Sequence, residues 1–163
     1  MDSEGFIIRE AKITDKEAIG EVYNSAISQG DGYSKREEKL LEFQDNEPME
    51  RLYTSNSTYV AESDNKVIGW CSLYPEKQCV DGLFVHPNYQ SNGIGSELLQ
   101  SVEEEALDQN MLKIWIASDV NVVDYYVERG YAVVEETNME AVNSDEEIPC
   151  VILVKSLHSK IAT

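Results

Sequence analysis

Residues 83–95 have the sequence LFVHPNYQSNGIG, in which an apolar run ends at a proline and two glycines precede a long segment. That segment has apolar residues at helical spacing: Leu98, Leu99, Val102, Ala106 and Leu107. Glycine lets a ligand approach the backbone closely, and the first amides of a helix have no acceptor within it. A strand, a glycine loop and a helix start in this order predict a pyrophosphate site, with a tight turn that binds nothing as the alternative.

Two other nucleotide-binding motifs are excluded by the residues that follow the glycines. A P-loop needs a lysine directly after its second glycine, and Ser96 stands there. A dinucleotide fingerprint needs a third glycine or alanine at position 98, which is a leucine.

The rest of the chain predicts alternating strands and helices. Strands are expected at residues 6–9, 58–62, 66–74, 79–85, 112–116, 131–134 and 150–154. Helices are expected at residues 14–27, with Thr14 and Glu17 as a capping box, at 34–53 with an interruption near Pro48, after Gly95, and at 121–129. This order predicts an α/β fold, a mixed sheet with helices on both faces, and a single domain over residues 1–163.

The charge is strongly acidic, with 31 Asp and Glu against 13 Lys and Arg and a formal net charge of -18. Such a field repels phosphate backbones, so we expect no nucleic-acid partner. The acidity has two readings: a solvated surface suited to a high-salt cytoplasm, or the attraction of a cationic substrate.

The three cysteines, Cys71, Cys79 and Cys150, are an odd number without paired spacing or a histidine cluster. We therefore expect reduced thiols, no metal site and a cytoplasmic location, with Cys79 a buried residue and not a nucleophile. No apolar run reaches the roughly 18 residues that cross a bilayer, and the first residues lack the pattern of a signal peptide, so no membrane contact is expected.

The segment Val85-His86-Pro87, followed by residues 90–95, resembles the GNAT superfamily of N-acetyltransferases. Its acetyl-CoA loop has the pattern Gln/Arg-x-x-Gly-x-Gly/Ala after a strand that ends in Val-x-Pro. Residues 125–131 are similar to the family's Phe-Tyr-Glu-Lys-x-Gly-Phe stretch, and Asp119 falls where many members carry Asn. The resemblance covers nearly the whole chain and implies a central, mostly antiparallel twisted sheet of about seven strands, flanked by helices on both faces.

The resemblance also implies how acetyl-CoA would bind. Strands 80–85 and 112–117 would splay, and pantetheine would enter the gap like an added strand. The backbone amide of Phe84 or Val85 would hold the thioester oxygen. The phosphates would contact the loop and the helix start: Gln90, Ser91, Asn92, Gly93, Ile94, Gly95 and Ser96. Because the loop has no Arg or Lys, we expect backbone amides to dominate that contact.

Two residues are predicted to move protons. Tyr126 matches the family's general-acid tyrosine, with a core aromatic as the alternative. Asp81 lies on the strand where some members place a catalytic glutamate, and a solvent-exposed carboxylate or one that only orients the substrate is the alternative. In a regular strand Asp81 faces the same side as Leu83 and Val85, whereas a bulge at Gly82 would reverse it.

These features predict an acetyl-CoA-dependent N-acyltransferase with no metal. The acceptor is expected to be a small cationic amine, or else a peptide N-terminus or lysine. A CoA-binding sensor or structural module with weak catalysis is the alternative, and transfer to a hydroxyl or from a longer acyl donor remains open. Many relatives form dimers, so a homodimer is compatible with the resemblance.

Overall fold

The computed structural model describes residues 5–29, 47–90, 92–140 and 146–158. Its strands are β1 (Ile7–Glu10), β2 (Ser57–Ser63), β3 (Lys66–Tyr74), β4 (Cys79–Val85), β5 (Lys113–Asp119), β6 (Ala132–Glu140) and β7 (Glu147–Ser156). Its α-helices are α1 (Lys16–Gln29), α3 (Glu47–Thr54), α4 (Ile94–Asp108) and α5 (Val123–Val127). The predicted helical region 34–53 is described only from residue 47, and Pro48 lies in the first turn of α3, where its missing N–H is tolerated.

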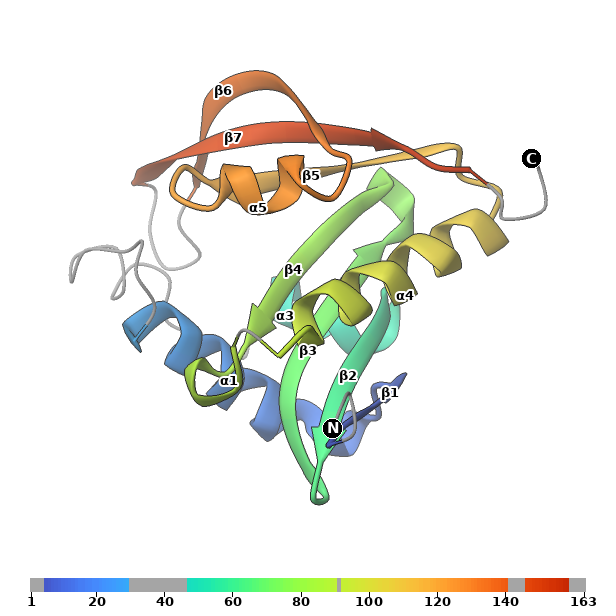
Figure 1. Cartoon of the computed structure of the whole chain (residues 1–163), viewed down its shortest axis with the longest axis vertical. Coiled ribbons are helices and arrows are strands. Elements are labelled where there is room, and N and C mark those ends of the chain that lie inside the picture. The colour runs from blue at the N-terminus through green and yellow to red at the C-terminus, as the bar shows by residue number, and fades with distance from the viewer. Residues whose placement is uncertain (1–4, 30–46, 91, 141–145, 159–163) are drawn as a thin grey trace.

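The seven strands form one sheet in the order β1-β2-β3-β4-β5-β7-β6 (Figure 1). Every neighbouring pair is antiparallel except β4 and β5, which run parallel. The predicted mixed, mostly antiparallel sheet is therefore confirmed. No helix among the described residues is long and apolar enough to cross a membrane.

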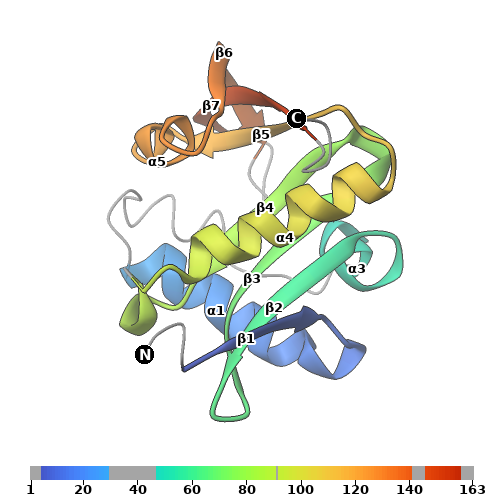
Figure 2. The same cartoon turned by 45° about the vertical axis from the view of Figure 1, so that its right-hand side comes forward.

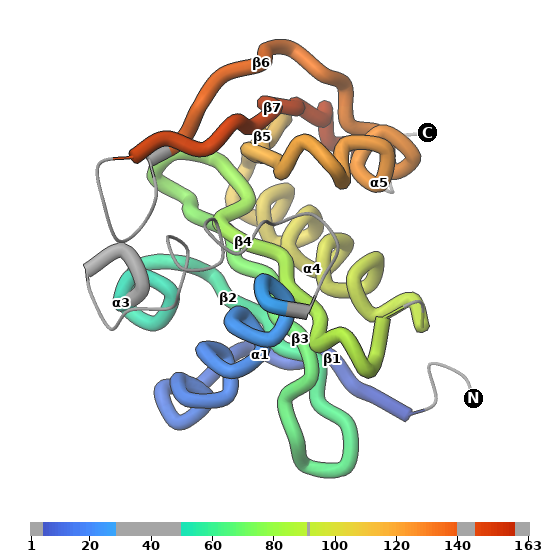
Figure 3. The backbone as a smooth tube through the Cα atoms, turned by 90° about the vertical axis from the view of Figure 1, so that its left-hand side faces the viewer, coloured from blue at the N-terminus to red at the C-terminus, as the bar shows by residue number. Residues whose placement is uncertain are grey.

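Helices cover both faces of the sheet, as predicted (Figures 2 and 3). On one face α4 buries Leu98, Leu99 and Val102 against the strands, and Tyr126 of α5 joins the same core. On the other face α1 buries Ile19 and other apolar residues, which pack with residues of α3 and the sheet. The strand β4 therefore lies between two apolar cores, one under α4 and one under α1.

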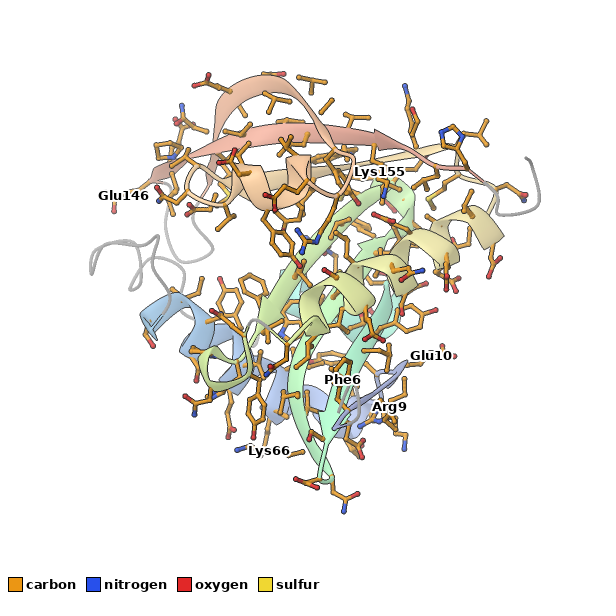
Figure 4. The ribbon with its side chains drawn as sticks, viewed as in Figure 1. Phe6, Arg9, Glu10, Lys66, Glu146 and Lys155 are labelled. Carbon is orange, nitrogen blue, oxygen red and sulfur yellow. The ribbon has the colours of Figure 1, made fainter. Side chains whose placement is uncertain are left out.

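Charged side chains fix two places in the fold. Arg9 donates two hydrogen bonds to Asp15, at 2.8 and 3.0 Å, and a third to Glu62 at 2.7 Å, which ties β1 to β2 and to the start of α1. Lys155 of β7 bonds Glu103 of α4 at 3.0 Å. Figure 4 shows Arg9 and Lys155 in separate halves of the molecule.

The predicted capping box of Thr14 and Glu17 is wrong. Thr14 lies inside a short 3₁₀ helix, Ile13–Asp15, that precedes α1. The carboxylate of Asp15 instead accepts the backbone N–H of Lys12 at 2.7 Å. Asp15 has this role because Arg9, which comes from the neighbouring strand, holds its carboxylate in place.

Candidate active site

A cavity lies in the gap between β4 and β5. The two strands pair at two positions only, the first two residues of β4 with the middle of β5: Cys79 with Trp115, and Val80 with Ile116. Beyond that pair the two strands diverge, as predicted (Figure 1). The gap forms a cavity of about 720 Å³, the first cavity, between residues 82–85 of β4 and 116–119 of β5, with residues of α1 and α5 at its sides.

A bulge at Gly82 shapes the β4 side of this gap. The φ angle of Gly82 is +117°, and the register with β3 shifts opposite it. A Cβ at this position would stand 2.7 Å from the ring of Trp70, so the strand needs glycine here. Val80 and Leu83 consequently share the α4 face, and Asp81 turns to the opposite face.

Asp81 is engaged by other side chains. Arg51 of α3 donates to both carboxylate oxygens, at 2.8 and 3.2 Å, and the amide of Asn56 donates to one of them at 2.9 Å. The Arg51 guanidinium also lies 4.6 Å above the ring of Tyr74. Among the described residues that line the cavities of the site, Asp81 is absent. Its role as the base stays a prediction.

The amides of β4 differ in direction. His86 N–H donates to Ile68 of β3 at 2.8 Å. Because successive N–H groups of a strand alternate in direction, the N–H of Phe84 also faces β3, whereas that of Val85 faces the gap. Of the two amides predicted to hold the thioester oxygen, Val85 is therefore the one directed to the cavity.

The glycine loop leads directly into α4. Gly93 is the N-cap, with a φ angle of +81°, and Glu97 N–H donates to its carbonyl at 3.2 Å. The amides of Ile94, Gly95 and Ser96 precede that first helical bond and have no acceptor within the helix. This is the arrangement that an anion site at a helix start requires.

The polar side chains of the loop mostly brace it. Gln90 donates to the carbonyl of Val85 at 3.2 Å, and Asn92 donates to that of Tyr89 at 3.2 Å. Ile94 is buried in the core, so only its backbone is available to a ligand. Ser91 lies outside the described residues.

A second cavity of about 480 Å³ lies over the loop and the start of α4. It is lined by residues 93–96, by Gln90 and by residues of α5. Leu83, Val85 and Tyr126 line both cavities, so the two cavities meet between β4 and α5.

Tyr126 lies at this junction and is 6% exposed. Its ring packs edge-to-face against Tyr125 and Tyr131, with centroid distances of 5.2 and 5.8 Å. Tyr126 is thus a core aromatic that also lines both cavities, and its role as the general acid stays a prediction.

Arg129 was missed by the sequence reasoning. Its Nε donates to the Ser96 hydroxyl at 2.9 Å, and its Nη1 donates to the Tyr125 carbonyl at 2.8 Å. The guanidinium stacks 3.6 Å from the centroid of the Tyr125 ring. It therefore brings a cation to the start of α4 from another element. The available signal was the spacing of four residues from Tyr125, which places both on one helical face.

The two cavities differ in charge. Among the described residues that line the first cavity, Asp119 is the only Asp, Glu, Lys, Arg or His. One of its oxygens accepts the N–H of Asn121 at 2.7 Å. Of these five residue types, the described lining of the second cavity contains Arg129 alone. The site thus has a cationic end at the glycine loop and an anionic end at β5.

Cys79 begins β4 and is buried. Burial, with the nearby carboxylate of Asp81, raises the pKa of its thiol to about 12. A thiol of this kind stays protonated at neutral pH, and the thiolate is the nucleophilic form. Cys79 is therefore a packing residue, as expected. In the described part of the chain, no group of three metal-ligating side chains could hold an ion.

The family model for the acetyltransferase (GNAT) domain matches residues 14–143. The chain belongs to the GNAT family. The family predicted from the loop and the Tyr126 segment is thereby confirmed, and membership supports an acetyl-CoA-dependent N-acyltransferase. An amino-acid acetyltransferase of Serratia proteamaculans is 32% identical over 83 residues, which are 47% of this chain and 18% of that protein.

Solved structures share the fold. A GCN5-related N-acetyltransferase from Rhodopseudomonas palustris superimposes with a TM-score of 0.86 at 20% identity, over 96% of this chain and 99% of that one. YncA, a putative acetyltransferase from Salmonella typhimurium solved with acetyl-CoA, gives a TM-score of 0.68 at 19% identity, over 97% of both chains. At these identities the likeness establishes the fold alone.

Proposed function

We propose that this chain transfers an acetyl group from acetyl-CoA to a cationic amine. The observation that supports this most is the meeting of the two cavities at Tyr126, one over the glycine loop and one in the gap between β4 and β5. The acetyl-CoA complex of the similar Salmonella protein supports the same donor. The donor would lie with its phosphates at the start of α4 and its thioester in the gap.

Acetyl-CoA supplies an activated acyl group as a thioester. In our proposal the N–H of Val85 holds the carbonyl oxygen as negative charge develops on it. The bonds from Gln90 and Asn92 to the loop carbonyls keep the phosphate-binding amides in place. These groups are held before the donor arrives, so little reorganisation accompanies the reaction.

Proton movements complete the transfer. As the amine nitrogen bonds to the acyl carbon and the carbon–sulfur bond breaks, Tyr126 donates its hydroxyl proton to the leaving sulfur. Before this attack the cationic amine passes one proton to Asp81 through water, because Asp81 does not line the cavity, and this frees the lone pair of the nitrogen. Arg51 and Asn56 orient the carboxylate of Asp81 for this step. The second proton of the nitrogen leaves to solvent as the amide forms. Solvent restores both groups afterwards.

The acceptor is proposed to be a cation because Asp119 is the only charged side chain among the described residues that line the first cavity. A small amine fits best, and a peptide N-terminus or lysine side chain shares the same chemistry. The net charge of -18 would draw either one toward the protein.

Release of free thiol from acetyl-CoA across a panel of amines, with the matching alcohols as controls, tests the proposal. We expect turnover with amines and none with alcohols. Binding of CoA without thiol release for any acceptor would contradict catalysis and favour the alternative of a CoA-binding sensor. Faster release with alcohols would assign hydroxyl transfer instead.

A further inference from the structure

We propose that Arg129 binds a phosphate of the donor and supplies the positive charge that the glycine loop lacks. The proposal rests on the proposed function, because it concerns the donor site of that reaction. It revises the expectation that backbone amides alone dominate phosphate binding.

The geometry of Arg129 leaves donors available for a ligand. An arginine carries five N–H donors in a planar fork. Two are used, by the Ser96 hydroxyl and the Tyr125 carbonyl. Among the described residues Nη2 makes no hydrogen bond, and the stack on the Tyr125 ring fixes the plane of the fork. The fork is thus already oriented for an anion before one binds, which lowers the entropy lost on binding.

Arg129 lies beside the free backbone amides at the start of α4. Its Nε bonds the hydroxyl of Ser96, whose backbone amide is one of the free donors at the start of α4. The guanidinium and the helix amides therefore border the same cavity. A phosphate there accepts bonds from both, and charge-assisted bonds from guanidinium are about twice as strong as neutral ones.

Arg129 is paired less closely with a carboxylate than three other cations of the described structure. Arg9, Arg51 and Lys155 each lie within 3.0 Å of a carboxylate oxygen. Arg129 bonds only neutral oxygens, and its ion-pair contact is to Glu128 at 3.9 Å, with Glu128 76% exposed. Arg129 is thus a partly buried cation whose one carboxylate contact is long and exposed to solvent. The described residues that line its cavity include no carboxylate, so this cation is suited to an anionic ligand.

The test compares CoA with pantetheine, which has the same thiol arm and no phosphate, in the wild type and in Arg129→Gln. Titration calorimetry measures both dissociation constants at fixed low salt. We expect Arg129→Gln to weaken CoA binding about 10-fold to 100-fold, the effect of losing charge-assisted bonds, and to leave pantetheine binding unchanged. Arg129→Lys keeps the positive charge but loses the planar fork of donors. Its affinity for CoA should lie between those of the wild type and Arg129→Gln.

Lys113→Gln is the matched control, because it also removes one positive charge. Lys113 is exposed and follows the C-terminal end of α4, about 20 Å from its start. We expect wild-type affinity for CoA in this variant. An equal loss for CoA and pantetheine in Arg129→Gln would show a structural role only and overturn the proposal, as would unchanged CoA binding.

The outcomes for Arg129 and for the proposed function are separable. If the wild type binds CoA but releases no thiol with any amine, the proposed function fails while the binding comparison still tests Arg129. If the wild type turns over and Arg129→Gln binds CoA equally well, the inference fails and the proposed function stands.

Discussion

The hydroxyl of Tyr125 lies directly against the backbone of Gly95, so that a Cβ at residue 95 would stand 2.5 Å from its oxygen. A Cβ at Gly93, two residues earlier, would have no atom within 4 Å, but the φ angle of Gly93 is positive. The two glycines of the loop are therefore required for different reasons: one for space and one for conformation.

Gly95→Ala should displace Tyr125 and weaken CoA binding, because the Tyr125 ring is also held by Arg129. Removing the hydroxyl with Tyr125→Phe in the same chain should restore most of the affinity. Gly93→Ala should instead lower the free energy of unfolding by about 1–2 kcal/mol through backbone strain, with no rescue by Tyr125→Phe. Calorimetry and thermal melts distinguish the two, and rescue of Gly93→Ala would contradict this division.

Tyr126→Phe should lower kcat by about 100-fold to 10,000-fold, the usual contribution of a general acid. The dissociation constant of CoA should stay near the wild-type value, because the ring packing against Tyr125 and Tyr131 is retained. Steady-state kinetics with a good amine acceptor measure the first quantity and calorimetry the second. An unchanged kcat would remove Tyr126 from the proton transfer.

Asp81→Asn should lower kcat by about 100-fold if its carboxylate receives the amine proton. The variant also breaks a bidentate ion pair, so a loss of stability is expected as well. Arg51→Lys separates the effects, because it weakens the pair while keeping the carboxylate, and should retain most of the activity. Equal losses of kcat in both variants would limit Asp81 to a structural role.

Asp119→Asn should raise KM for a cationic amine about 10-fold and leave KM for acetyl-CoA unchanged. The hydrogen bond from Asn121 can be kept by the amide oxygen, so the turn after β5 should persist. In the wild type, kcat/KM for the cationic amine should be higher at low salt than at high salt. This difference should be smaller in the variant, because an attractive charge has been removed. A KM for the amine that does not change would place the acceptor elsewhere.

Asp15 should contribute acid-sensitive stability. The hydrogen bonds from Arg9 hold the pKa of its buried carboxyl below its ordinary value. A lowered folded-state pKa gives stability that is present above the unfolded-state pKa of about 3.9 and lost as pH falls through the folded-state value. Asp15→Asn should cost about 2 kcal/mol at pH 7 and much less near pH 2. Urea denaturation at both pH values checks this, and a cost independent of pH would contradict it.

The sequence alone determined the order of the elements, the mixed sheet and the glycine loop that leads into α4, where we propose the anion site. These features depend on local patterns: strand and helix periodicities, glycines at a turn, and the Tyr126 segment at a set distance from the loop. Each can be recognised from neighbours in the chain, because backbone conformation and amphipathic faces arise over a few residues.

Only the tertiary structure shows which charged side chains meet in the site and which way the side chain of Asp81 points. Ser96 and Arg129 are 33 residues apart, and Arg51 and Asp81 are 30 apart, so no local pattern reports their contacts. The direction of Asp81 depends on a bulge at Gly82, whose glycine is needed by the ring of Trp70 on the neighbouring strand. The glycine loop itself contains no cation, and folding brings Arg129 to it, because packing joins side chains that are distant along the chain.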